Sequence, residues 1–261
     1  MLNKIVFLLS LLPLLAAPLA IGLTETEPLV EAAEFPELAP TDLMAQETMR
    51  VIEMLETLHF NNQEISDEVF IDLIREYMAS LDYNKLYFLQ SDEDRFIDTF
   101  GSRLSMQLRH KGDLSVAFSI YETYRAVALE RIHSNLERLK EDWSFESEEE
   151  YEYDRTESPW ASSKEEAEEL WGKRLKQEIL QELLNDKTAD EAKERIAKRY
   201  ERQLRSLKEF SSSDVQEVFL TSLTHLFDPH STFFSSDTFE EFSIHMRLSL
   251  VGIGALLSED D

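Results

Sequence analysis

Residues 66–81 read SDEVFIDLIREYMASL, and this stretch decides the fold class. Its large apolar residues recur at steps of three and four: Val69, Phe70, Leu73, Ile74, Tyr77, Met78 and Leu81. Such steps place the side chains on one broad face of a helix, and Ser66 supplies a side chain suited to cap its first turn. The stretch therefore predicts a helix with one face in a hydrophobic core.

Residues that break helices are rare on both sides of this stretch. Between residues 41 and 251 the glycines are Gly101, Gly112 and Gly172, and the prolines are Pro159 and Pro229. A region of this length with so few breakers is typical of a helical domain. We therefore expect a mainly α fold, with a multi-helix domain over residues 41–246.

Polar residues that cap helices divide this region. Thr41 precedes a first helix with Met44, Val51, Leu55 and Leu58 on its core face, and Gly112 ends a helix before a long one begins near Asp113. Reciprocal caps, in which a side chain three residues on returns to the capping residue, are predicted for the pairs Ser91 and Asp94, Ser163 and Glu166, Thr188 and Glu191, and Ser213 and Gln216. Residues 81–90, LDYNKLYFLQ, lack helical period and predict an ordered connector.

The N-terminal region has the character of an export signal. Residues 1–22 contain Lys4, an apolar run and a small-residue end at Ala20-Ile21-Gly22, which predicts a cleaved signal peptide. A retained membrane anchor is the alternative, and it is the only membrane contact that we expect. Residues 23–40 are acidic and rich in proline, so we interpret them as a linker.

Composition excludes several classes of function. The 53 acidic residues against 26 Lys and Arg give a net charge of −27, which disfavours nucleic acid as a partner. The absence of cysteine excludes disulfides and a thiol nucleophile. None of the six histidines lies in an HExxH pattern, so we expect neither a metal site nor a cofactor.

Asp228-Pro229-His230-Ser231 contains the residue types of a hydrolytic triad. Near neighbours on an extended segment do not point three side chains into the mutual geometry that a triad needs. The favoured interpretation is that Asp228-Pro229 ends a helix and the polar side chains stabilise a turn. We therefore assign no catalytic residue in this chain.

The hydrophobic period changes after this turn. Leu248 and Leu250, and then Ile253, Ala255 and Leu257, alternate around Gly252 and Gly254, which predicts a strand, a bend and a second strand. Glycines beside an apolar residue can expose successive backbone N–H groups that hold a carboxylate. An ordinary glycine bend is the simpler interpretation.

These motifs together resemble a known family. Five stretches show the resemblance: LDYNKLYFLQSD at 81–92, Trp171 with Arg174-Leu175-Lys176, Arg199-Tyr200, DPHS at 228–231, and LSLVGIG at 248–254. They are similar to the helical N-terminal region and the entry into the PDZ domain of tail-specific proteases, the bacterial C-terminal processing peptidases. The resemblance covers residues 45–261, and Val251 and Ser236 depart from its usual Glu and Pro.

The resemblance implies a serine endopeptidase in the periplasm, which recognises protein substrates by apolar C-termini. In this family a later domain supplies a serine nucleophile and a lysine base. It implies that residues 247–261 begin a PDZ domain that is truncated here, with Gly252, Ile253 and Gly254 as its carboxylate-binding loop. The rival hypothesis is a stand-alone exported helical protein that binds substrates or a protein adaptor without catalysis.

Overall fold

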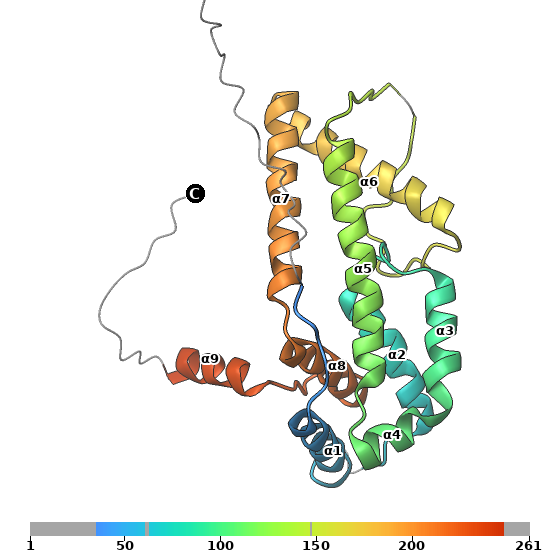
Figure 1. Ribbon diagram of the computed structural model, residues 1–261, viewed down its shortest axis with the longest axis vertical. Coiled ribbons are helices and arrows are strands. Elements are labelled where there is room, and N and C mark those ends of the chain that lie inside the picture. The colour runs from blue at the N-terminus through green and yellow to red at the C-terminus, as the bar shows by residue number, and fades with distance from the viewer. Residues whose placement is uncertain (1–34, 61–62, 147, 248–261) are drawn as a thin grey trace, which may run out of the picture. The chain divides into compact units, whose positions relative to one another are not determined.

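Helices account for most of the chain that the structure describes. The computed structural model describes residues 35–60, 63–146 and 148–247, and those from Pro36 onward belong to one structural unit (Figure 1). The elements are α1 (Asp42–Thr57), α2 (Asp67–Leu81), α3 (Gln90–Phe100), the 3₁₀ turn η1 (Gly101–Arg103), α4 (Leu104–Lys111), α5 (Ser115–Arg138), α6 (Lys164–Leu184), α7 (Ala189–Glu209), α8 (Ser212–Phe227) and α9 (Ser236–Arg247). The mainly α fold class is confirmed. The two predicted PDZ strands lie outside the described residues.

α2 lies at the centre of the main hydrophobic cluster. It packs chiefly against α8 and also contacts α3, α4 and α5. The predicted stripe is confirmed, since its inner members are fully buried: Phe70, Leu73, Ile74, Tyr77 and Met78. Burial of each such side chain stabilises the fold by roughly 1.5–3 kcal/mol. The Tyr77 ring meets Phe219 of α8 edge-on, with 5.2 Å between centroids.

α5 also contributes to a second buried region, formed with α6 and α7. α7 lies alongside α5, and α6 packs against α7 near the C-terminal end of α5 (Figure 1). A polar chain joins all three helices inside this region: Asn135 donates to the Tyr200 hydroxyl at 3.0 Å, and that hydroxyl donates to Glu178 at 3.1 Å. A buried amide is thereby satisfied by a side chain from another helix, which fixes how the helices sit.

The predicted connector between α2 and α3 is ordered around one buried carboxylate. Asp82 is only 2% exposed. Its Oδ1 accepts from the backbone N–H of Leu86 at 2.7 Å, and its Oδ2 accepts from those of Tyr87 at 2.8 Å and Phe88 at 3.1 Å. The indole N–H of Trp160 also donates to Oδ2, at 2.9 Å. Four donors thus compensate the cost of burying this charge.

Two tryptophans from distant parts of the chain complete the connector. Trp171 of α6 donates its indole N–H to the Leu86 carbonyl at 2.8 Å. Lys85 has a positive φ of 56°, and its ammonium lies 3.8 Å from the centre of the Trp160 ring. The connector therefore joins the α2 region to the α6 region through side chains rather than through a continuous helix.

Three of the predicted caps are found at the expected residues. The Thr41 hydroxyl accepts from the Met44 N–H at 3.2 Å. Thr188 and Glu191 form the full reciprocal box. Ser163 caps α6 as expected, but the Glu166 carboxylate accepts from Ser162 instead of closing the box on Ser163.

Ser66 stands at the N-cap position of α2, but its side chain makes no capping hydrogen bond, so that part of the prediction is wrong. Two of the predicted reciprocal caps are also wrong. α3 begins at Gln90, not after Ser91, and Asp92 rather than Asp94 accepts from the backbone N–H of the capping residue Leu89. The cause is tertiary, because the Gln90 N–H is drawn to the Ala161 carbonyl at 3.0 Å.

The predicted pair Ser213 and Gln216 is also wrong. Ser211 and Asp214 form the box two residues earlier. Gln216 is buried and donates to the Met44 carbonyl at 3.1 Å, a partner on α1 that the local sequence does not reveal.

The expected helix faces and ends need three further corrections. Leu58 is not on the core face of α1 but past its end and 74% exposed, while Thr48 and Ile52 are buried with Leu55. The single helix expected before Gly112 is interrupted by η1. The long helix begins at Ser115, whose N–H donates to Asp113.

The end of the expected linker contacts the helical unit. Arg125 donates to the Pro36 carbonyl at 3.0 Å, and the Ala39 N–H donates to Ser212 at 3.1 Å. Leu38 packs partly against the core. Across residues 35–60, 63–146 and 148–247, no helix has both the length and the apolar character needed to cross a membrane.

Replacing Asp82 by Asn tests the connector. We expect Asp82→Asn to lower the free energy of unfolding by about 3 kcal/mol, because the amide NH₂ would face backbone donors. Chemical denaturation measures it. Asp72→Asn is the control: Asp72 is half-exposed and pairs with Arg75 at 2.8 Å, so we expect a loss below about 0.5 kcal/mol. Equal losses would contradict the importance of the buried carboxylate.

Gly112 and Gly101 form a second matched pair. A methyl group on Gly112 would lie 1.9 Å from the Ala45 carbonyl oxygen of α1, at a φ of +59°. On Gly101 its nearest neighbours would lie 3.6 Å away. We expect Gly112→Ala to destabilise by at least about 2 kcal/mol and Gly101→Ala to stay within about 1 kcal/mol of the parent. Thermal unfolding of both variants compares them, and a stable Gly112→Ala would refute the close approach of α1 and α4.

Candidate functional site

The segment after α8 forms the turn that the sequence predicts. α8 ends at Phe227, Asp228 is extended, and the Ser231 N–H donates to the Asp228 carbonyl at 2.9 Å. The Ser231 hydroxyl donates to the Asp228 carboxylate at 2.9 Å. The interpretation of DPHS as a turn tied by polar side chains is confirmed.

The structure adds a histidine that sequence reasoning missed. His59, just beyond α1, places its Nε2 atom 3.3 Å from the Ser231 hydroxyl and 3.5 Å from the Asp228 carboxylate. Its ring also meets Phe227 edge-on at 5.0 Å. His59 precedes Ser231 by 172 positions, so no local motif could have linked them. We call His59, Asp228 and Ser231 the junction cluster.

The junction cluster has the composition of a triad but not its geometry. In a triad the aspartate holds one ring nitrogen of histidine while the other nitrogen takes the serine proton. Here Asp228 and Ser231 both approach the same nitrogen of His59, and Ser231 donates directly to Asp228. A serine whose proton is held by a carboxylate is not activated as a nucleophile. The cluster therefore ties the end of α1 to the turn after α8.

Hydrogen bonding also sets the charge state of this cluster. The Ser231 hydroxyl lowers the pKa of Asp228 below its ordinary value, and the His230 backbone adds to the effect while desolvation opposes it. Asp228 is thus an anion at neutral pH that accepts from its neighbours.

An apolar hollow of about 320 Å³ opens beside the junction cluster. Its walls come from α1 and from the segment that follows α8: Val51, Met54, Leu55, Leu58, His59, Thr224, Ser231, Thr232 and Phe233. The volume suits one or two apolar side chains. The elements that form it are remote in sequence and are held together by the junction cluster.

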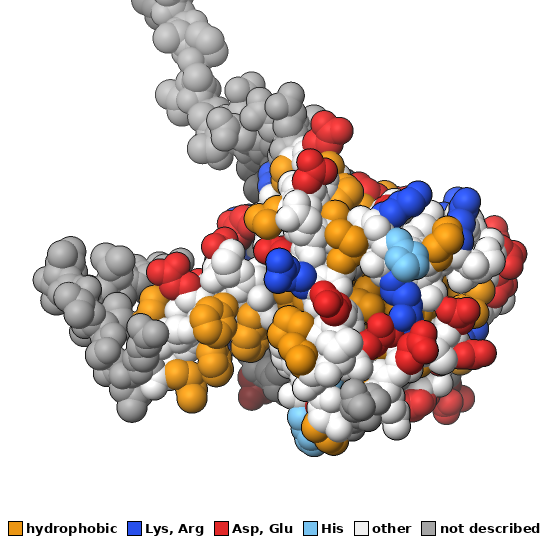
Figure 2. Space-filling model, turned by 90° about the horizontal axis from the view of Figure 1, so that it is seen from below, with side chains coloured by type: hydrophobic (Ala, Val, Ile, Leu, Met, Phe, Trp, Pro, Cys, Tyr) orange, Lys and Arg blue, Asp and Glu red, His pale blue; other side chains and the backbone are white. Residues whose placement is uncertain are grey.

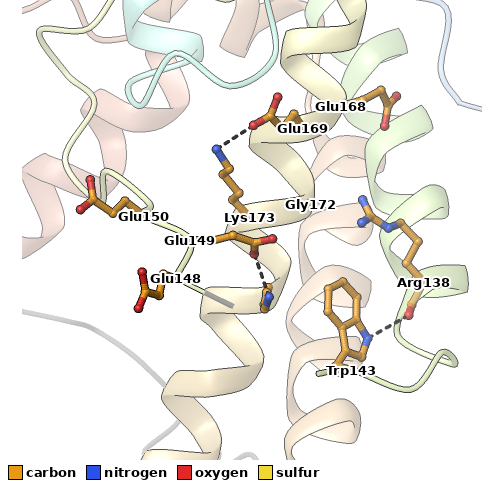
Figure 3. A pocket seen from close by; sticks show the side chains of 10 residues that line it. Arg138, Trp143, Glu148, Glu149, Glu150, Glu168, Glu169, Gly172 and Lys173 are labelled. Atoms are coloured by element: carbon orange, nitrogen blue, oxygen red, sulfur yellow. Dashed lines mark hydrogen bonds and ion pairs between the residues drawn. The ribbon is translucent and has the colours of Figure 1, made fainter. Parts of the chain in front are cut away.

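A second hollow, of about 700 Å³, lies where Glu148, Glu149 and Glu150, in the segment between α5 and α6, face α6 and the end of α5 (Figure 3). Two of its carboxylates form ion pairs with lysines in the same lining: Glu169 with Lys173 at 2.7 Å, and Glu149 with Lys176 at 2.8 Å. In the chain that the structure describes, no group of three His, Asp or Glu residues is arranged to hold a metal ion.

The predicted carboxylate-binding residues Gly252, Ile253 and Gly254 lie outside the described residues. Their role stays a prediction. The site within the described residues is instead the junction cluster with its apolar hollow, which α9 separates from those residues along the chain.

Comparison with known proteins identifies the class. Residues 51–237 match the family model described as the tail-specific protease N-terminal domain, so they include both the Asp82 connector and the DPHS turn. The chain belongs to the tail-specific protease family. It is 32% identical over 235 residues to the tail-specific protease of Haemophilus influenzae. The match covers 87% of this chain and 34% of that relative, so the chain spans about a third of the relative's length.

Removing the charge of Asp228 tests the junction cluster through pH. The pKa of Asp228 is lower in the folded state than in the unfolded state, so ionised Asp228 stabilises the fold. This stabilisation is fully present above the unfolded-state pKa. It is lost as the pH falls through the folded-state pKa. We expect Asp228→Asn to destabilise at pH 6 and the difference from the parent to shrink below about pH 4. Thermal unfolding across pH measures this. Asp237→Asn on exposed α9 is the control, and an Asp228→Asn effect independent of pH would contradict the role of the carboxylate.

Proposed function

We propose that the chain is the N-terminal portion of an exported serine endopeptidase, which processes or degrades proteins recognised by their C-termini. The observation that carries this proposal is the family match over residues 51–237. The helical unit acts as a scaffold and contains no catalytic residue. It works in the periplasm, to which residues 1–22 direct it as a signal peptide, followed by the linker 23–40.

The described geometry supports a scaffold role in two ways. The junction cluster lacks the arrangement of an activated nucleophile. Contacts with the α1 region fix the direction of the chain after α8. A domain that follows in the chain would need such a fixed direction to hold a defined position relative to the helical unit. On this proposal, residues 247–261 begin a PDZ domain in which Gly252, Ile253 and Gly254 receive the substrate carboxylate, and serine and lysine come from the part of the protease beyond the matched third.

A second function is favoured by the apolar hollow and the exposed side chains around it. Met54 and Leu58 at its edge are 54% and 74% exposed, which is typical of a surface that binds another protein. The chain would then act alone as an exported binding or adaptor protein. A cooperative melt and a monodisperse state of the isolated chain would favour this alternative.

Activity measurements separate these proposals. We expect the isolated chain to leave an unfolded substrate with a free apolar C-terminus uncut, at the level of an inactive-preparation control. A chimera, in which the chain replaces the matching third of the Haemophilus influenzae protease, should cut that substrate and spare its C-terminally amidated form. The rate of product formation is the measurement. Cleavage by the isolated chain would contradict the proposal that the catalytic serine and lysine lie outside it. Equal cleavage of the amidated substrate would contradict recognition of the free C-terminus.

A further inference from the structure

The segment that joins α8 to α9 runs back along α8 in an extended form. The Phe233 carbonyl accepts from the Thr221 hydroxyl of α8 at 3.1 Å, and the Ser235 N–H donates to Glu217, one turn earlier on α8, at 3.0 Å. Two residues of the segment therefore match four residues of the helix. Four helical residues rise about 6 Å and two extended residues about 6.6 Å, so the two lengths agree.

Burial alternates along the same segment. Ser231, Phe233 and Ser235 are half-buried, whereas Thr232 and Phe234 are exposed. A period of two is that of a β-strand with one face against the protein. We call residues 231–235 the extended segment.

One edge of the extended segment is open. In an extended chain, the N–H and C=O groups of successive residues point to opposite edges. The edge that contains Phe233 and Ser235 bonds to α8. On the opposite edge, the N–H and C=O groups of Thr232 and Phe234 make no hydrogen bond to any part of the chain that the structure describes. Two donors and two acceptors thus have the spacing of an unpaired strand edge.

Apolar surface adjoins both exposed residues. Thr232 and Phe233 belong to the wall of the apolar hollow, which accommodates one or two side chains. The Phe234 ring lies 5.3 Å from that of Phe242, which belongs to an exposed apolar stripe on α9 with Phe239 and Met246. Figure 2 shows hydrophobic side chains gathered on the part of the surface that α9 occupies.

The open edge and the hollow together define a ligand. We propose that the extended segment binds an extended stretch of another polypeptide by strand addition, with an apolar side chain of that stretch in the hollow. Backbone donors and acceptors at a spacing of two residues are matched by another extended backbone. The net charge of −27 favours neutral or basic residues in the ligand and disfavours a second copy of this chain. An unfolded stretch of protein meets these requirements.

The site is preorganised. The junction cluster fixes Ser231, and Glu217 fixes Ser235, so binding does not have to order the extended segment. The inference deepens the binding role proposed for the apolar hollow and is independent of peptidase activity. Its failure would leave the proposed protease function standing.

A labelled peptide tests the site on the full chain. The peptide alternates leucine with threonine, has a lysine at each end, and is amidated, which removes the carboxylate that residues 252–254 are proposed to bind. Thr232→Pro removes one open N–H, and Thr232→Ala keeps it. We expect Thr232→Pro to weaken binding by at least about 10-fold and Thr232→Ala by less than about 2-fold, measured by fluorescence anisotropy.

Two further measurements cover a Thr232→Pro variant that fails to fold. Leu58→Asp, at the hollow, should weaken binding by about 10-fold, whereas Leu43→Asp, on exposed α1 surface outside the hollow, should have little effect. In the unaltered chain, the peptide should slow hydrogen exchange of the Thr232 and Phe234 amides and leave that of Phe233 unchanged.

The proposal is overturned if the unaltered chain does not bind the peptide, or if folded Thr232→Pro binds it as well as Thr232→Ala. Protection of Phe233 instead of Thr232 and Phe234 would also refute it. Self-association of the chain that Thr232→Pro abolishes, measured by sedimentation, would assign the open edge to a second copy and would contradict the proposed ligand.

Discussion

The buried carboxylate of Asp82 is the interaction on which the arrangement of the helical unit depends. It organises the turn that follows α2 by accepting three backbone N–H groups, and it accepts from the indole of Trp160, 78 positions away. A neutral side chain of similar size could not accept four donors. One residue thus closes the end of the central helix and attaches the segment that leads into α6.

The junction cluster also joins segments that are distant in sequence. It lies just after the C-terminal end of α8, the helix that packs against α2. α8 packs on α2, and the residues that follow α8 are tied back to the end of α1 by His59. The first and last parts of the helical unit therefore constrain each other. Both ends of this constraint lie within the residues that match the family model.

The amphipathic pattern predicted the helices better than it predicted their ends. The stripe of α2 and the caps at Thr41 and Thr188 follow from local chemistry, in which a hydroxyl meets an N–H three residues away. Ser91 and Ser213 satisfy the same rule on paper but do not cap. At both sites a hydrogen bond to a residue remote in sequence sets where the helix begins. The Gln90 N–H donates to the Ala161 carbonyl, and the Gln216 side chain donates to the Met44 carbonyl.

The sequence by itself determined the helical class, the ordered connector, the turn at Asp228 and the family, because each depends on residues close together in the chain. Only the tertiary structure revealed that Trp160 satisfies Asp82, that His59 joins Asp228 and Ser231, and that α9 exposes its apolar stripe. These features depend on which helices pack together. Side-chain pairing between helices carries no periodic signal along the chain, so it becomes visible only when the helices are in place.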